Sequence, residues 1–387
     1  MFHWKRFIVR TLSYVLVAAV SALAAIMLWG NGFSKLEALE WVIENKFIGQ
    51  ADMEKARDAA AAAMVDALGD KWSYYIPAEE YSAFQESKNN TYVGVGITIT
   101  QREDGTGMDI KGVEPDGPAE EQGILPGDIL IEVAGQSLAG MTSAEVSQII
   151  GGEKGTTVEV GILRNGEKLT FTLERKSIRA VVVEGQLLDG GIGLVQIENF
   201  NANSAAETIA LIKDLQAQGA QKLIFDVRNN RGGYLRQMTD VLDYLLPEGV
   251  LYREEDRSGK TDLIKSDDAC LEMPMAVLVN KRSYSAAELF AAALKEYDWA
   301  SVVGEHTTGK GYYQNTIPLP DGSAVNLSTG KYFTSNGVNL MEVGGIAPDV
   351  EILVDEETDA YIYYDLISPA DDPQIQAAIQ TLNKTAD

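Results

Sequence analysis

The 387-residue sequence predicts a multidomain α/β (α+β) protein whose largest part is a βαβ core with a largely parallel sheet. Three stretches of the chain, each with its own residue pattern, predict this fold class. After residue 178, short apolar runs alternate with helical stretches, as in "IGLVQI", "SAAETIALIKDLQAQG" and "KLIFDVRN". Between residues 91 and 177, short β-rich runs are divided by glycine turns. Before residue 90, apolar positions recur at helical spacing, for example in "LEALEWVIENKF".

The N-terminus predicts a membrane anchor. Lys5, Arg6 and Arg10 precede the nineteen uncharged residues from Thr11 to Trp29. A helix of that length spans roughly 28 Å, close to the hydrocarbon thickness of a bilayer. Because a basic flank stays in the cytoplasm, we expect a single-pass protein of the cell membrane with everything after Gly30 on the extracytoplasmic side. A signal peptide cleaved near "ALA" at 22–24 is the alternative, and it would give a secreted protein.

These observations divide the chain into five expected segments. Residues 1–30 form a cytoplasmic tip and the transmembrane anchor, and residues 31–90 form a helical region. Residues 91–177 form the β-rich domain, inside which "RNG" at 164–166 predicts a hairpin turn. Residues 178–354 form the α/β core. The C-terminal tail, 355–387, opens with "DEETDAYIYYDL" and gives no readable pattern.

Composition excludes several classes of function. Lys and Arg total 32 against 57 Asp and Glu, and a net charge of −25 argues against nucleic acid as a partner. The single cysteine, Cys270, excludes an intramolecular disulfide, a zinc knuckle and a paired-cysteine redox site. The two histidines, His3 and His306, are too few for a His-rich metal site. We therefore expect no metal and no cofactor.

The segment "GEHTTGKG" at 304–311 raises the question of nucleotide binding. It follows the strand-like "SVV" and matches most of the phosphate-binding pattern G-x4-G-K-[S/T]. That pattern requires a hydroxyl for Mg²⁺ after the lysine and then a helix. Here Gly311 stands at that position, and the following tyrosines predict a strand. We expect no nucleotide, so Lys310 needs another explanation.

Suitable residues for chemistry follow three predicted strands. In open α/β sheets, active sites gather just past the carboxyl ends of the strands. Ser285 follows "MAVLVN" and opens a helix, and Lys310 follows "SVVG". A serine at such a turn is exposed, and the amides of the helix N-terminus can hold an oxyanion. Taken alone, however, Ser285-x-x-Glu288 favours a capping box, a pattern that Ser204-x-x-Glu207 repeats.

A serine nucleophile needs a base. His306 is the one histidine on the same side of the expected membrane as Ser285. Lys310 is the other candidate, because burial among apolar groups lowers the pKa of a lysine, although a Gly-Lys-Gly string is more often a surface turn. The third strand end carries "DVRNNRGG", whose adjacent glycines permit the close backbone approach of an oxyanion hole. Asp226 and Arg228 in this string are expected to be structural.

Four strings in order resemble the C-terminal processing peptidases, also called tail-specific proteases: "DVRNNRGG", "SYSAAE", "TTGKG" and "GGIAPDVEI". The resemblance runs from about residue 36 to residue 354. It implies that Ser285 is the nucleophile, that Lys310, 25 residues later (310 − 285), is the base, and that Gln314 orients the lysine. It also implies an oxyanion hole formed by the amides of Gly232 and Ala286.

The sequence departs from the pattern of this family at three positions. Thr308 replaces an aromatic residue, Ala287 replaces a serine and Arg231 replaces a proline. None of these changes removes a reacting group, so they bear on substrate preference and rate. His306 is expected to be a bystander, as histidines in such positions commonly are.

The β-rich segment resembles a PDZ domain through "YVGVGI" and the longer "EPDGPAEEQGILPGDILIEVAGQSL". Gly94, Val95, Gly96 and Ile97 would bind the peptide, because successive amides form a nest for a terminal carboxylate while the peptide adds as an edge strand.

Together these features imply a membrane-anchored serine endopeptidase that recognises substrate C-termini and cleaves through an acyl-enzyme. The expected partners are protein or peptide substrates with free apolar C-termini and, through the N-terminal helix, the membrane. Nucleic acid and nucleotides are not expected, and a homo-oligomer is left open. Two alternatives remain: a catalytically silent PDZ-type peptide-binding scaffold, and a Ser285–His306 hydrolase acting on esters.

Overall fold

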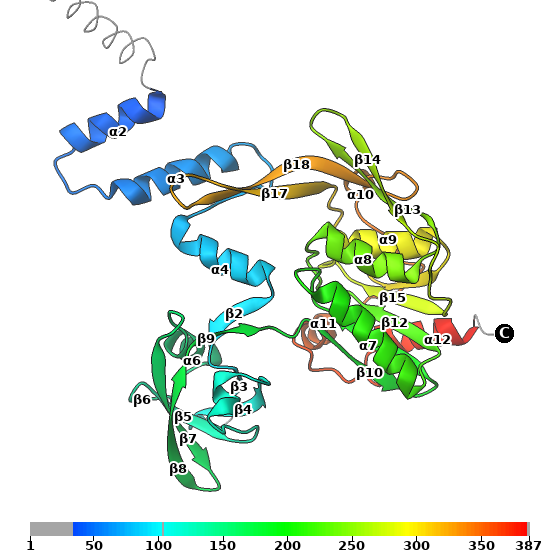
Figure 1. Cartoon of the computed structure of the whole chain (residues 1–387), viewed down its shortest axis with the longest axis horizontal. Helices are drawn as coiled ribbons and strands as arrows, with labels where there is room; N and C mark the ends of the chain where they lie inside the picture. Colours follow the sequence, from blue (N-terminus) through cyan, green and yellow to red (C-terminus); the bar gives the residue numbers. More distant parts are fainter. Residues whose placement is uncertain (1–33, 103, 385–387) are drawn as a thin grey trace, which may run out of the picture. The chain divides into compact units, whose positions relative to one another are not determined.

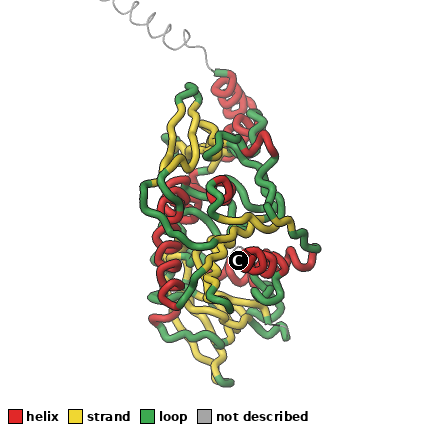
Figure 2. The backbone as a smooth tube through the Cα atoms, turned by 90° about the vertical axis from the view of Figure 1, so that its right-hand side faces the viewer, coloured by secondary structure: helices red, strands yellow, loops and turns green. Residues whose placement is uncertain are grey.

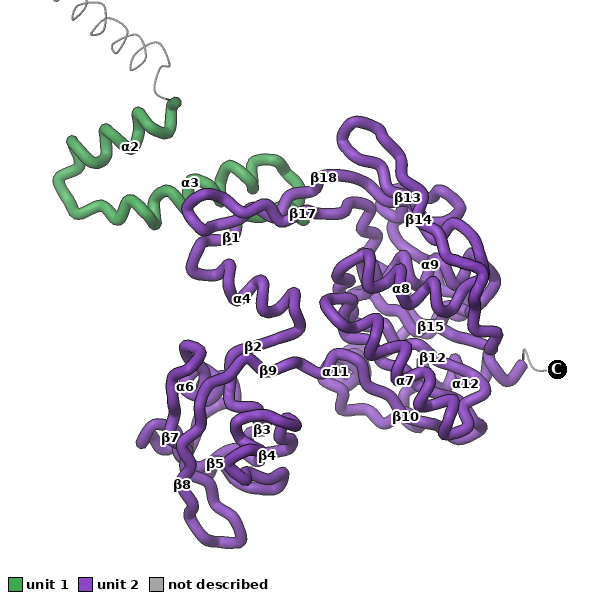
Figure 3. The backbone as a smooth tube through the Cα atoms, in the orientation of Figure 1, with its two compact units in different colours: residues 1–75 green, residues 76–387 purple. Residues whose placement is uncertain are grey.

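The computed structural model describes residues 34–102 and 104–384 (Figure 1). The predicted anchor, Thr11–Trp29, lies outside the described residues. Among the helices within those two ranges, none combines the length and apolar character needed to cross a bilayer. The chain divides into two compact units, residues 1–75 and 76–387 (Figure 3).

The described part of the first unit contains two helices, α2 (Lys35–Lys46) and α3 (Met53–Asp66). Ser34 starts α2 with a complete capping box, because its hydroxyl accepts from Glu37 N while the Glu37 carboxylate accepts from Ser34 N. Strand β1 (Tyr74–Ile76) follows, and α4 (Ala78–Lys88) opens the second unit. These helices confirm the helical prediction for the region before residue 90.

The β-rich domain is an antiparallel sheet with its own hydrophobic core. Its strands follow the order β3, β4, β5, β7, β8, with β6 paired to β5. They span β3 (Ile97–Gln101), β4 (Met108–Val113), β5 (Ile129–Val133), β6 (Gln136–Ser137), β7 (Thr157–Arg164) and β8 (Glu167–Glu174), and two helices accompany them, α5 (Pro118–Glu121) and α6 (Ser143–Ile150).

The two ends of this domain lie together, because β2 (Thr91–Gly94) pairs antiparallel with β9 (Lys176–Arg179). The predicted hairpin turn joins β7 to β8, and Asn165 and Gly166 both have positive φ, as a tight hairpin requires. The domain therefore leaves and rejoins the rest of the chain at a single place.

The α/β core is built on a six-stranded sheet in the order β10, β11, β12, β15, β16, β19. The strands from β11 to β19 pair in parallel, and β10 pairs antiparallel at one edge. They span β10 (Val183–Leu188), β11 (Ile192–Ile197), β12 (Lys222–Asp226), β15 (Met275–Val279), β16 (Ala300–Gly304) and β19 (Val350–Glu351). The predicted α/β class with a largely parallel sheet is confirmed.

Helices cover both faces of this sheet, which explains why β15, "MAVLV", is buried along its whole length. Successive residues of each strand point to opposite faces of the sheet and so contribute to two separate hydrophobic cores. One core packs against α7 (Ser204–Gln218), α8 (Leu235–Leu245) and α9 (Ala286–Glu296). The other packs against α12 (Pro373–Lys384), and Figure 2 shows this helix near the C-terminal end of the chain.

A second, antiparallel set of strands was not predicted from the sequence. β13 (Gly249–Asp256) pairs with β14 (Thr261–Ser266) and with β18 (Ala324–Thr334), which also pairs with β17 (Tyr312–Pro318). The short helix α10 (Leu340–Val343) follows β18. Strand β17 begins two residues after Lys310, as the tyrosines after the lysine predicted.

The C-terminal tail, unreadable from the sequence, forms α11 (Glu356–Tyr363) and α12 and is fastened to the core by a buried ion network. Arg228 donates to both oxygens of Asp226, and its Nη1 donates to Asp372 at 2.8 Å and to Gln374 at 3.0 Å. All four side chains are buried. The structural role expected for Asp226 and Arg228 therefore extends to holding the start of α12.

Replacing Asp372 with alanine is expected to lower the free energy of unfolding by about 3–5 kcal/mol, because breaking a buried ion pair leaves uncompensated charge. Asp372 also caps α12 by accepting from the amides of Gln374 and Ile375. Chemical denaturation measures the effect. The matched control is Asp371→Ala, since Asp371 is exposed and adjacent. Equal effects of the two changes would contradict the structural role assigned to Asp372.

Candidate active site

Ser285 lies in the turn between β15 and α9, at the N-cap of the helix. Its backbone has φ +63° and ψ −124°, a conformation that a residue with a side chain rarely adopts and that costs of order 1–3 kcal/mol. Hydrogen bonds to the neighbouring strand end hold the turn: Ser283 Oγ donates to Val227 O, and Tyr284 N donates to Asn230 O. Ser285 is 8 % exposed, so little water reaches it.

Lys310 lies in the turn after β16, the strand that pairs directly with β15 in the sheet. It too is 8 % exposed. Its Nζ donates to Gln314 Oε1 at 2.5 Å, and the Gln314 amide donates to Ser328 Oγ at 2.9 Å and to Tyr312 O at 3.2 Å. These bonds fix which way the Gln314 side chain faces, so its oxygen meets the amine. With its oxygen held in this direction, Gln314 can orient the amine of Lys310.

Glu288 ties the serine turn to the lysine turn. One carboxylate oxygen accepts from Thr307 Oγ1 at 2.5 Å and Gly309 N at 2.7 Å. The other accepts from Lys310 N at 2.9 Å and Ser285 N at 3.0 Å. The side chain is completely buried, and this burial raises the pKa of Glu288 although the four hydrogen bonds favour the carboxylate.

The sequence assigned Glu288 only to a helix cap. A capping pattern relates residues three positions apart, whereas three of the four donors to this carboxylate lie nineteen to twenty-two residues downstream. The capping interpretation was therefore incomplete, because Glu288 joins two loops as well as starting α9.

Tyr332, on β18, also contacts both turns and was not found from the sequence. Its hydroxyl donates to Lys310 O at 2.5 Å. The ring is completely buried, and burial raises the pKa of Tyr332 well above its usual value, although the nearby Ser285 side chain acts to lower this pKa. Glu288 thus contacts the backbones of both Ser285 and Lys310, and Tyr332 lies beside both residues, so the two turns meet in one buried region.

The loop with the predicted oxyanion-hole glycine lies directly against Ser285. Gly232 has φ +83°, and a Cβ added there would lie 2.8 Å from Ser285 Cβ and 3.0 Å from Ala286 N. Only glycine permits this approach. In this conformation Gly232 N donates to Asn230 Oδ1 at 2.8 Å. The two predicted oxyanion-hole residues are therefore adjacent, with the Gly232 amide engaged by its own loop.

His306, the alternative base, has an exposed side chain, and its Nδ1 lies 3.4 Å from Thr307 O. It shares the turn with Lys310, which is buried.

The second Ser-x-x-Glu string turns out differently from the first, and its interpretation as a capping box was wrong. The N-cap of α7 is Asn203, which has φ +69°, so Ser204 is already inside the helix. Ser204 Oγ donates to Asn201 O, and Glu207 pairs with Arg179. The helix starts one residue earlier than the pattern indicates because Asn203 adopts the left-handed conformation.

The predicted peptide-binding residues lie where β2 gives way to β3. Gly94 ends β2, Val95 and Gly96 form the connection, and Ile97 opens β3. Val95 O accepts from Ala119 N and Gly96 O accepts from Glu114 N, both at 3.0 Å, so the loop is fastened to its own domain. β3 is an edge strand of its sheet, and an edge strand is able to accept an added peptide strand.

Comparison with known proteins identifies two regions of the chain. Residues 191–352 match peptidase family S41, and residues 110–164 match the PDZ domain. The carboxy-terminal processing protease CtpA of Bacillus subtilis (strain 168) is 31% identical over 322 residues, which cover 82% of this chain and 68% of the relative. A probable CtpA-like serine protease of Staphylococcus saprophyticus is 29% identical over 362 residues, covering 90% and 73%.

Among solved structures, the photosystem II D1 C-terminal processing protease is similar, with 28% identity and a TM-score of 0.48 over 82% of this chain and 87% of that chain. The family match covers most of the α/β core, with the turns that hold Ser285 and Lys310, and the relative from Bacillus subtilis extends the similarity over most of the chain. The chain therefore belongs to peptidase family S41, among the carboxy-terminal processing serine proteases that carry a PDZ domain.

Proposed function

We propose that this S41 peptidase is an endopeptidase that binds substrate C-termini through its PDZ domain and cleaves peptide bonds with Ser285 as nucleophile and Lys310 as base. One observation supports the pairing: Glu288 accepts from the backbone amides of both Ser285 and Lys310, and all three residues are buried. Gln314 orients the amine through its side-chain oxygen. The name of the relative from Bacillus subtilis, which refers to carboxy-terminal processing, supports cleavage near substrate C-termini.

The proposed reaction begins with Lys310 in its neutral form. Nζ takes the proton of Ser285 Oγ as the oxygen attacks the peptide carbonyl, and the amides of Gly232 and Ala286 hold the oxyanion. The amine product leaves with a proton from Lys310, and water then hydrolyses the acyl-enzyme with the same lysine as base. For the Gly232 amide to act, its hydrogen bond to Asn230 Oδ1 must give way to the oxygen of the substrate.

Ser285→Ala is expected to abolish cleavage of a peptide with an apolar C-terminus while leaving its binding unchanged. Cleavage is followed by mass spectrometry and binding by fluorescence anisotropy, using the same peptide with an amidated C-terminus to test recognition of the carboxylate. Cleavage by Ser285→Ala at the wild-type rate would refute the proposal. A wild-type chain that binds the peptide but never cuts it would instead be a silent PDZ scaffold.

We also propose that Thr11–Trp29 anchors the chain in the cell membrane and places the protease on the extracytoplasmic side. The support is the uncharged run with its basic flank. Recovery of the full-length chain in the membrane fraction, digestible by protease added outside intact cells, is the expected result. Release of a shortened chain into the medium would favour the cleaved signal peptide.

A further inference from the structure

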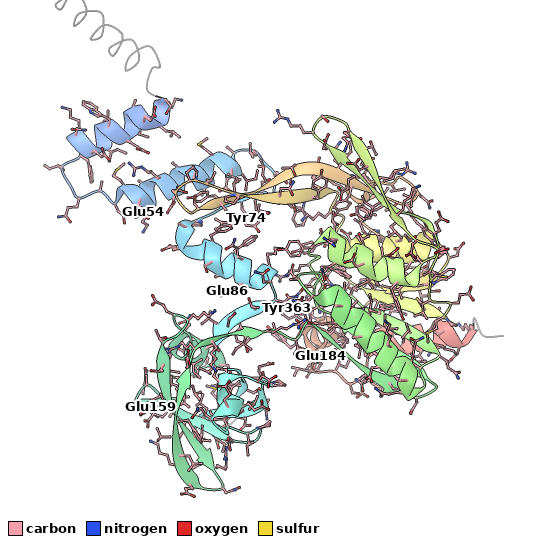
Figure 4. All side chains as sticks on the ribbon, in the orientation of Figure 1. Glu54, Tyr74, Glu86, Glu159, Glu184 and Tyr363 are labelled. Atoms are coloured by element: carbon pink, nitrogen blue, oxygen red, sulfur yellow. The ribbon has the colours of Figure 1, made fainter. Side chains whose placement is uncertain are left out.

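Arg282 belongs to the nucleophile turn, three residues before Ser285, and has no role in the proposed reaction. Its guanidinium makes two parallel bonds to Asp359 of α11, Nη1 to Oδ1 at 2.8 Å and Nη2 to Oδ2 at 2.7 Å. The guanidinium carbon also lies 5.1 Å from the centre of the Tyr363 ring, labelled at the end of the same helix in Figure 4. Two-point pairing of this kind fixes direction as well as distance.

The same guanidinium reaches the loop that leads to Gly232. Arg282 Nη1 lies 3.3 Å from Asn229 Oδ1, which also accepts from Asn280 Nδ2 at 2.9 Å. Asn280 Oδ1 in turn accepts from both Asn229 N and Arg282 N at 3.0 Å. Asn229 has φ +61°, so these bonds hold a backbone that would otherwise relax.

Two further bonds connect this arrangement to the reacting atoms. The residue after Asn229, Asn230, accepts from Tyr284 N through its carbonyl and from Gly232 N through its side chain. Gly232 in turn lies against Ser285. A shift of Asn229 would therefore move the oxyanion-hole glycine relative to the nucleophile.

We propose that Asp359 and Arg282 form a positioning pair through which α11, in the C-terminal tail, holds the Asn229 loop and keeps the Gly232 amide aligned with Ser285. The inference rests on the proposed function of Ser285 and Gly232. Neither member of the pair reacts, so both act through Asn229.

Asp359 and Arg282 differ in the charged residues that lie near them. Arg282 holds the pKa of Asp359 down at about 2, so the pair is ionised at every pH at which the protease would be assayed. Lys281 Nζ also lies 3.0 Å from Asp359, and buried Glu305 adds negative charge near Arg282. If Arg282 is removed, Asp359 keeps Lys281 as a partner. Removing Arg282 should therefore displace the Asn229 loop more than it lowers the free energy of unfolding.

The test compares Arg282→Met, Asp359→Asn and the double variant with Lys281→Met as matched control, because Lys281 touches the same carboxylate but not Asn229. The full chain is assayed with a fluorogenic peptide at neutral pH. We expect each single variant to lower kcat tenfold to about a hundredfold, the size of effect that small misplacements produce, with KM within twofold. The double variant should be no worse than the worse single variant, and Lys281→Met should match the wild type.

Arg282→Lys, which keeps the charge but loses the two-point bond, should recover only part of kcat. Unchanged kcat in Arg282→Met, additive losses in the double variant, or an equal loss in Lys281→Met would overturn the inference. Should Arg282→Met fail to fold, the isosteric Asp359→Asn carries the test. Activity remaining in Ser285→Ala would refute the proposed function, whereas an inert Ser285→Ala beside a fully active Arg282→Met would refute only the positioning role.

Discussion

Replacing Lys310 with methionine is expected to lower kcat/KM for peptide cleavage by about a thousandfold, within the range that removal of a general base produces. Methionine keeps most of the length and apolar stem of the lysine but has no amine to take the proton of Ser285. Removing the buried amine removes its desolvation cost but also the donor to Gln314 Oε1, so we expect only a small net change in the free energy of unfolding. Steady-state kinetics on the purified chain, with thermal unfolding measured in parallel, check both expectations.

His306→Ala is the matched control for this change. It lies four residues before Lys310 in the same turn, and its side chain is exposed. We expect it to retain activity within twofold. If Lys310→Met kept more than a tenth of the wild-type rate, or if His306→Ala lost activity to the same degree, the lysine would not be the base.

Glu288→Gln is expected to lower kcat about a hundredfold and the free energy of unfolding by about 2–4 kcal/mol, because bonds to a buried charged group contribute about 1.5–3 kcal/mol each. Each carboxylate oxygen accepts from at least one backbone amide, Gly309 N at one and Ser285 N and Lys310 N at the other. The amide nitrogen of glutamine would therefore face a backbone donor in either orientation. The serine and lysine turns would then separate, and kcat would fall.

The pH dependence of stability gives a second readout for Glu288. Burial raises the pKa of Glu288, so the folded chain keeps this proton to a higher pH than the unfolded chain does. The resulting stabilisation is fully present below the unfolded pKa of about 4.3 and is lost as the pH rises through the raised value. Glu288→Gln should lack this part of the slope when unfolding is measured across mildly acidic pH.

The control for Glu288 is Glu145→Gln in the PDZ domain. Glu145 completes a true capping box with Thr142, and its side chain is exposed. Glutamine still completes the box, so this change should cost less than about 1 kcal/mol and leave kcat unchanged. A similar small cost for Glu288→Gln, with normal activity, would mean that Glu288 is merely a helix cap.

The sheet of the α/β core was predictable because its strands are short, apolar and regularly separated by helices. β15 is buried along its whole length, and a continuous apolar run of this kind predicts a buried strand from the sequence alone. The C-terminal tail was not predictable for the opposite reason. Helix α12 is rich in polar residues, and its start is fixed by Asp372 and Gln374 bonding to Arg228, 144 and 146 positions away in the sequence. No local pattern reveals a partner at that separation.

The candidate site divides in the same way. Ser285 and Lys310 follow successive strands, and those strands, β15 and β16, are neighbours in the sheet. Glu288 and Tyr332 escaped prediction because their importance lies in contacts between turns, and a capping box or a buried tyrosine in a strand already has an ordinary explanation. The engagement of the Gly232 amide by Asn230 depends on loop conformation, which residue types alone do not determine.

Activation of the Ser285 hydroxyl by the amine of Lys310 is tested most directly by the rate at which a fluorophosphonate probe labels the chain. Peptide mass spectrometry locates the labelled residue. We expect a single label on Ser285, formed at least about a hundredfold more slowly in Lys310→Met and at the wild-type rate in His306→Ala. Labelling of Ser285 at an equal rate in Lys310→Met, or a label on another residue, would contradict the claim.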